Sequence, residues 1–163
     1  MTNKEFYIKT IAAEAPVFIK ILRALPADKL DFKPGDKART MESIASQLAA
    51  QPAAILGAVT TGVPTMDPHE KKGASDIATI VAEAEKNFKK LQDGLPTISD
   101  DDWENGTATL TYPGGKWETK RYDMAWGFLF DAIHHRGQLS SYLRAVGAKV
   151  PAIYGGSADE RPS

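Results

Sequence analysis

The sequence predicts an all-α protein, an antiparallel four-helix bundle with a short hairpin or extended loop before the last helix. Three observations support this fold class. Four long segments repeat apolar residues at the spacing of one helix face. Strands alternating with helices, as a parallel α/β sheet requires, are missing from the pattern. The 163 residues, 42% hydrophobic and 25% charged, fit one globular domain over residues 1–163.

The first expected helix covers residues 3–25, and its apolar stripe consists of Ile8, Ile11, Ala15, Phe18, Leu22 and Leu25. The second covers residues 40–60, with Thr40 as its N-cap and a stripe of Met41, Ile44, Leu48, Ile55 and Val59. Pro16 and Pro52 lie inside these helices and predict kinks, because proline removes a backbone hydrogen bond.

The third expected helix covers residues 76–93, starting at Ser75 or Asp76 and stopped by Gly94. Residues 96–120 carry two turn signals, Asn105-Gly106 and Pro113-Gly114-Gly115, around a β-prone stretch, which predicts an irregular hairpin or a loop. The last helix covers residues 120–146 and ends at Gly147, the residue type that follows many helices.

Composition excludes several function classes. Without cysteine the chain has no disulfide, no cysteine-ligated metal and no thiol nucleophile. Twenty basic and 21 acidic residues give a net charge of −1, so we expect no nucleic-acid partner. No apolar run approaches the ~20 residues of a membrane span, and the first five residues are not those of a secretory signal. We therefore expect no membrane partner and a cytoplasmic location.

The last helix carries the one unusual polar cluster. At roughly 100° per residue, Asp131, His135 and Gln138 fall within the apolar stripe of Met124, Phe128, Leu139, Tyr142 and Val146, with His134 at its edge and Arg136 well away. Asp131 and His135 are neighbours on one face. They could form a buried pair, capped by Gln138, that only holds the fold. Alternatively, they could be two ligands of a divalent metal in the core.

Two motifs carry a resemblance to a known family. The run from His134 to Leu139 is followed by Tyr142-Leu143-Arg144, Gly147, Val150-Pro151 and Tyr154-Gly155. This pattern resembles the C-terminal signature of the DinB-like (DinB/YfiT) superfamily. The stretch Ala24-Leu25-Pro26 through Leu30-Asp31-Phe32-Lys33-Pro34 resembles that family's first inter-helix linker. The resemblance spans nearly the whole chain.

The resemblance implies a four-helix bundle, commonly dimeric, with nickel or zinc held by three histidines at one end of the core. Characterised relatives are thiol-dependent enzymes, such as bacillithiol S-transferases and mycothiol-dependent maleylpyruvate isomerase. At the three ligand positions this chain has Gln47, Asp131 and His135. Two oxygen donors in place of imidazoles shift the preference toward harder ions such as manganese. We therefore expect a divalent metal (Ni, Zn or Mn) to bind weakly or not at all.

Two functions remain open from the sequence. The first is a metal-dependent enzyme, either a thiol-dependent transferase acting with a low-molecular-weight thiol or a hydrolase-like relative. The second is a metal-free bundle that binds a small molecule or a partner. In either case we expect Gln47, Asp131 and His135 to converge, with His134, Gln138 and Tyr142 beside them. Gln51 is a further possible oxygen donor, and His69 is expected to be a surface residue.

A second apolar face lies opposite the core stripe of the last helix. Trp126, Phe130 and Ile133 project there, at roughly 180° to 240° in the same frame. Either the hairpin region or a second subunit must cover this face. Because relatives commonly dimerise, the resemblance favours a homodimer with Trp126 or Phe130 in its interface.

Overall fold

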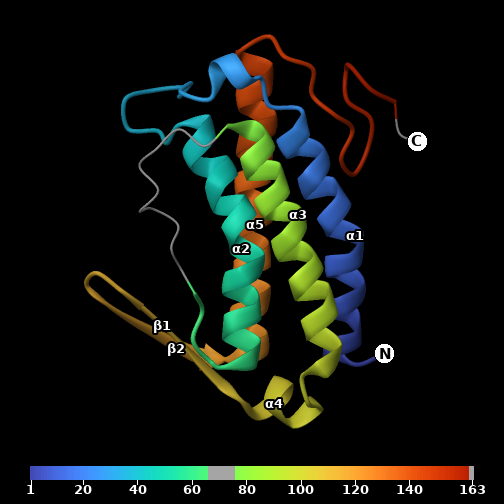
Figure 1. Ribbon diagram of the computed structural model, residues 1–163, viewed down its shortest axis with the longest axis vertical. Coiled ribbons are helices and arrows are strands. Elements are labelled where there is room, and N and C mark those ends of the chain that lie inside the picture. The colour runs from blue at the N-terminus through green and yellow to red at the C-terminus, as the bar shows by residue number, and fades with distance from the viewer. Residues whose placement is uncertain (66–75, 162–163) are drawn as a thin grey trace.

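The computed structural model describes residues 1–65 and 76–161, and most of them are helical. The helices of this part are α1 (Asn3–Arg23), α2 (Met41–Thr60), α3 (Ile77–Gly94), the short α4 (Asp100–Asn105) and α5 (Arg121–Ala145). Strands β1 (Thr107–Tyr112) and β2 (Gly115–Lys120) form an antiparallel hairpin before α5. Figure 1 shows the long helices side by side, with the hairpin projecting from one end. No helix of the described ranges is long and apolar enough to cross a membrane.

Side-chain caps explain where the helices begin. The Thr40 hydroxyl accepts the backbone N–H of Ser43, as the sequence predicts. Thr2 and Glu5 form a reciprocal capping box at the start of α1. At the end of α5, Gly147 has φ +75°, and the N–H groups of Gly147 and Ala148 bond back to the carbonyls of Arg144 and Leu143. This is the glycine-terminated helix end expected from the sequence.

The long helices do not simply alternate in direction, which corrects the antiparallel arrangement expected from the sequence. Asn87 of α3 donates to the carbonyl of Ala49 in α2, and Gly94 lies beside Leu56. The later residue of α2 thus contacts the later residue of α3, so these two helices run parallel (Figure 1). The 16 residues between these helices are enough for the chain to return to the end where α2 began.

Contacts of α5 show the same mixture of directions. Gln51 of α2 bonds to the carbonyl of Phe128 in α5. Val59, eight residues later in α2, bonds to Arg121, an earlier residue of α5, so α2 and α5 are antiparallel. Tyr7 of α1 donates to the carbonyl of Ala125. Further along both helices, Glu14 pairs with Arg136, so α1 and α5 are parallel.

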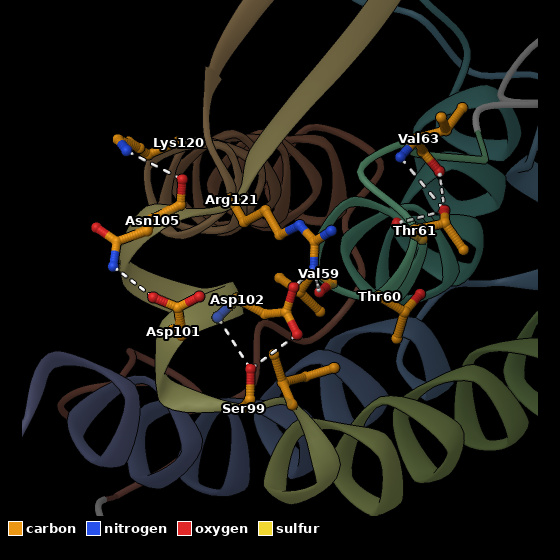
Figure 2. A network of polar contacts seen from close by, with 12 residues as sticks. Val59, Thr60, Thr61, Val63, Ser99, Asp101, Asp102, Asn105, Lys120 and Arg121 are labelled. Atoms are coloured by element: carbon orange, nitrogen blue, oxygen red, sulfur yellow. Dashed lines mark hydrogen bonds and ion pairs between the residues drawn. The ribbon is translucent and has the colours of Figure 1, made fainter.

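The segment before the hairpin is a helix, α4, where the sequence predicts a hairpin or loop. Ser99 caps it by accepting the N–H of Asp102, and three aspartates fill its first turn, where the helix dipole favours negative charge. Figure 2 shows Arg121 reaching from the start of α5 to the Asp102 carboxylate and the Val59 carbonyl. These bonds join α4 and α5 to the end of α2.

The hairpin covers one side of α5. Its register pairs Thr107 with Lys120 and Tyr112 with Gly115, around a turn in which Gly114 has φ +100°. The Trp117 ring lies edge-on to Phe128, with centroids 6.3 Å apart, and a side chain at Gly127 would meet it. A glycine at this place in α5 therefore lets the hairpin approach the helix closely.

Aromatic residues fill the core where α1 begins. Trp103 is fully buried, and its ring lies 5.2 Å from that of Tyr7. The Asn3 side-chain oxygen accepts the indole N–H groups of Trp103 and Trp126, at 3.0 and 3.3 Å. The first residue of α1 is thus bound to two residues more than 95 positions away in the sequence.

Arg136 is buried, although its helical position predicts that it points away from the core. Its guanidinium pairs with Glu14 and the Tyr154 hydroxyl, and lies 4.5 Å from the centre of the Phe18 ring. The apolar stripe that contains Met124 is the face of α5 that packs against α2. A second face of α5 is covered by α1 and the C-terminal tail, and Arg136 lies there.

Candidate functional site

A polar cluster lies between the first half of α2 and the middle of α5. We define the polar cluster as Arg39, Gln47, Gln51, Asp131 and His135. Gln47 Nε2 and Gln51 Nε2 both donate to Asp131 Oδ2, at 2.9 and 3.1 Å. Gln51 also donates to the Phe128 carbonyl at 2.9 Å. The structure thus brings the three residues of the expected site into one cluster, together with Gln51, which the sequence suggested as a further oxygen donor and which here donates through Nε2.

The carboxylate of this cluster is more exposed than the helical wheel indicates. The Asp131 side chain is 44% exposed, and that of His135 is 14% exposed. Water therefore reaches the carboxylate, and the large cost of a fully buried charge does not arise. Asp131 Oδ1 lies 3.4 Å from His135 Nε2, which places a carboxylate oxygen and an imidazole nitrogen side by side at an accessible edge.

Gln138 orders both neighbouring histidines. Its Oε1 lies 2.7 Å from His135 Nδ1, and its Nε2 lies 3.1 Å from His134 Nε2. Since Oε1 only accepts, His135 carries a proton on Nδ1. A neutral His135 then directs the Nε2 lone pair toward Asp131, whereas a charged one donates Nε2–H to it. His134 is exposed; Gln138 links it to the cluster, and its ring lies 5.3 Å from that of His135.

Arg39 is the member of the polar cluster that sequence reasoning missed. It precedes the N-cap of α2, outside any periodic segment. Its guanidinium donates to Gln47 Oε1 and to Ser43 Oγ, the latter from Nε at 3.1 Å. Burial lowers the pKa of Arg39, and the negative charge of Asp131 opposes this effect. The one available signal was its spacing of four and eight residues from Ser43 and Gln47.

Tyr142 supports the segment that carries Arg39. It is buried, and its hydroxyl donates to the Arg39 carbonyl at 3.1 Å. Its ring lies edge-on to Phe32 of the linker, with centroids 5.6 Å apart. The residue expected beside the site therefore contacts the polar cluster through the backbone of Arg39 and fixes that backbone before α2.

The donor set does not fit a divalent metal ion held by Gln47, Asp131 and His135. The Gln47 oxygen already accepts from a guanidinium, and its NH₂ group faces Asp131. Only Asp131 Oδ1 and His135 Nε2 are left to ligate, fewer than the three or more protein ligands usual for zinc. Within residues 1–65 and 76–161, no group of three or more His, Cys, Asp or Glu could hold a metal.

Two other features lie away from the polar cluster. A cavity of about 330 Å³ lies between α1 and the C-terminal tail and is lined by Pro16, Val17, Lys20, Ala152, Ile153, Tyr154 and Gly155. His69, expected at the surface, lies outside the described residues.

An aromatic patch, defined as Phe6, Trp126 and Phe130, lies on α1 and α5. Trp126 is half-buried because Phe6 and Tyr7 of α1 cover it, with centroids at 5.7 and 4.8 Å. Phe130 stacks on Trp126 yet stays 60% exposed, and Phe6 is 49% exposed. Of the two expected interface residues, α1 thus covers Trp126, and Phe130 is open.

Fold and site together define a mostly helical protein with a carboxylate–imidazole pair between two long helices. Its sequence matches the DinB family over residues 1–161. The chain belongs to the DinB family. A search of curated proteins finds no match.

Solved structures that share the fold include two DinB-like proteins. A DinB-like protein from Bacillus cereus ATCC 10987 superposes with a TM-score of 0.73 at 17% identity, over 92% of this chain and 97% of that one. A DinB-like protein from Bacillus subtilis gives a TM-score of 0.66 at 14% identity, over 89% and 95%. At these identities the similarity establishes the fold alone.

Proposed function

We propose that this DinB-family protein binds a small organic molecule at the polar cluster, through a hydrogen-bond donor of that molecule. The observation that carries the proposal is the 3.4 Å approach of Asp131 Oδ1 and His135 Nε2. With Nδ1–H bonded to Gln138, neutral His135 offers a lone pair beside a carboxylate oxygen. Two acceptors side by side repel unless a donor lies between them. A hydroxyl, amine or amide N–H would bridge them.

The geometry around the pair favours binding over loose solvation. Gln47 and Gln51 occupy the other carboxylate oxygen, so Asp131 is held in one orientation. Gln138 holds the imidazole in the same way. A site whose polar groups are fixed in advance loses less entropy when a ligand arrives.

We infer that α1, α2, α3 and α5 act as a four-helix bundle that supports this site.

The second candidate is the metal-dependent enzyme suggested by the family resemblance, a thiol transferase or a hydrolase-like relative. It is favoured by the same pair of atoms, since carboxylate oxygen and imidazole nitrogen are both metal ligands. It is opposed by the amide orientation of Gln47. Without a metal, a thiolate formed here would lie beside the negative charge of Asp131, so thiol activation is disfavoured.

Nuclear magnetic resonance of ¹⁵N-histidine-labelled protein tests the proposal. We expect ethanolamine, ethylene glycol or propionamide, titrated without metal, to shift the His135 ring signals saturably. Asp131→Asn should weaken this response, and His134→Ala should keep it. If none of the three probes gives a saturable shift, the proposal is wrong. If 2-mercaptoethanol binds only after Ni²⁺ or Zn²⁺ is added, the second candidate is correct.

We also propose that the protein is a homodimer that buries the aromatic patch. Phe6 and Phe130 expose large apolar surfaces on either side of Trp126. Contiguous exposed aromatic surface is typical of an interaction site, and a two-fold axis can pair one such patch with its own copy.

A further inference from the structure

The guanidinium of Arg39 is bound firmly inside the polar cluster. Nε donates to Ser43 Oγ at 3.1 Å. The terminal nitrogen Nη2 donates to the Ser43 carbonyl at 2.8 Å and to Ser43 Oγ at 2.9 Å. Nη1 donates to Gln47 Oε1. These bonds hold the cation at the first turns of α2, so moving it away would break several of them at once.

Gln47 links this cation to the carboxylate of Asp131. Its oxygen accepts from Arg39, while its NH₂ group donates to Asp131 Oδ2 at 2.9 Å and to Gln51 Oε1 at 3.3 Å. The amide is therefore oriented by charge at both ends. Turning its oxygen toward Asp131 and His135, as metal ligation requires, would direct the NH₂ group at a guanidinium, which has no acceptor.

The charges of the cluster are balanced by the chain itself. The carboxylate of Asp131 stabilises the charged form of Arg39 and raises its pKa against the effect of burial. Arginine stays charged at any physiological pH. The negative charge of Asp131 is therefore already offset by the Arg39 guanidinium. A divalent cation approaching Asp131 Oδ1 and His135 Nε2 would also be repelled by that guanidinium.

We propose that Arg39 is the built-in cation of this site and that its guanidinium excludes divalent metal ions from Asp131 and His135. The inference goes beyond the proposed function, because binding of an organic donor does not require that metal be excluded. It assigns the exclusion of metal ions from the site to one residue, Arg39, in the linker before α2. Removing that charge should turn the same cluster into a metal site.

Binding of Mn²⁺, measured by the electron paramagnetic resonance signal of the free ion, tests this. Arg39→Gln removes the charge but keeps hydrogen-bond donors, whereas Arg39→Lys keeps the charge. Arg23→Gln is the matched control, since Arg23 forms an exposed ion pair with Glu85. We expect Arg39→Gln to bind Mn²⁺ at least about tenfold more tightly than the wild type. A tenfold gain in affinity corresponds to ~1.4 kcal/mol of repulsion removed. Arg39→Lys and Arg23→Gln should match the wild type.

Adding His135→Ala to Arg39→Gln should abolish the gain and thereby locate the ion. The inference is overturned if wild type and Arg39→Gln bind Mn²⁺ equally, or if Arg39→Lys gains as much as Arg39→Gln. If Arg39→Gln does not fold, the wild type decides: one equivalent of Mn²⁺, lost in His135→Ala, overturns the inference, and its absence supports it. The organic probes are titrated without metal, so their failure would be a separate result.

Discussion

Arg136 holds a charge almost wholly out of water. Its side chain is 2% exposed, and that of its partner Glu14 is 11% exposed. The guanidinium lies between the rings of Phe18 and Tyr154, 4.5 and 4.8 Å from their centres. The Tyr154 hydroxyl also donates to Glu14, and burial followed by this bond raises the pKa of Tyr154. The network joins α1, α5 and the C-terminal tail.

Replacing Arg136 by methionine should lower the free energy of unfolding by about 3–5 kcal/mol, because Glu14 would be left as a buried charge without its partner. Urea denaturation measures the change. Adding Glu14→Gln should recover part of the loss. Arg144→Met, which removes a more exposed ion pair to Asp159, should cost at most about 1 kcal/mol. Equal losses for Arg136→Met and Arg144→Met would contradict this account.

Individual site residues were predictable where helical spacing governs them. Asp131 and His135 are four residues apart in one helix, so their contact follows from the sequence. The exposure of Asp131 did not follow, because a helical wheel gives a direction but not what covers it. Arg39 lies in a linker without periodicity. Its place in the polar cluster depends on how the linker meets α2, which no local pattern specifies.

Among the connecting elements, the turn after α2 depends on the backbone freedom of Gly62. This residue has φ +74°, and its carbonyl accepts the N–H of Thr109 at 2.8 Å, joining the end of α2 to β1. A Cβ added here would lie 2.6 Å from the Thr107 carbonyl oxygen. Glycine is thus required both by the left-handed backbone and by the close approach of the strand.

Gly62→Ala should therefore destabilise the protein by about 2 kcal/mol or more, from the left-handed conformation and the clash together. Thermal unfolding followed by circular dichroism measures this. Gly35→Ala is the control, since a Cβ there meets nothing within 4 Å, and it should leave stability nearly unchanged. If Gly62→Ala is as stable as Gly35→Ala, β1 can shift away from the added methyl group without loss of stability, and this account is wrong.

The long helices were predictable as elements, and their arrangement was only partly so. Apolar stripes and caps located α1, α2, α3 and α5 to within a few residues. The short α4 was missed because six residues hold too little periodicity, although Ser99 and three aspartates form a helix start. The parallel course of α2 and α3 was also missed, since a connection of this length allows a return in either direction.

At the scale of the whole molecule, the aromatic patch sets the expected assembly. Phe130 stacks on Trp126 and is still 60% exposed within the described part of the chain. We expect light scattering at micromolar concentration to give twice the 17.7 kDa of one chain. Phe130→Ser should shift the mass toward that of a monomer, because it removes apolar surface from the interface.

Tyr112→Ser is a suitable control for the dimer, because Tyr112 is an exposed aromatic residue at the hairpin turn, away from the patch. It should leave the mass unchanged. A wild-type monomer across the concentration range would refute the homodimer. If Phe130→Ser is still a dimer, the interface lies elsewhere on the protein.

The double acceptor at Asn3 has a consequence for how the chain is made. Trp103 and Trp126 donate to the first residue of α1 from more than 95 positions downstream. During synthesis from the N-terminus, α1 emerges long before either indole exists to bind it. The capping box of Thr2 and Glu5 is complete within the first residues, whereas both bonds to Asn3 need the chain up to Trp126. These two contacts of the earliest-made residues therefore form late in synthesis, and the indole fluorescence of Trp103 and Trp126 is the natural probe of them.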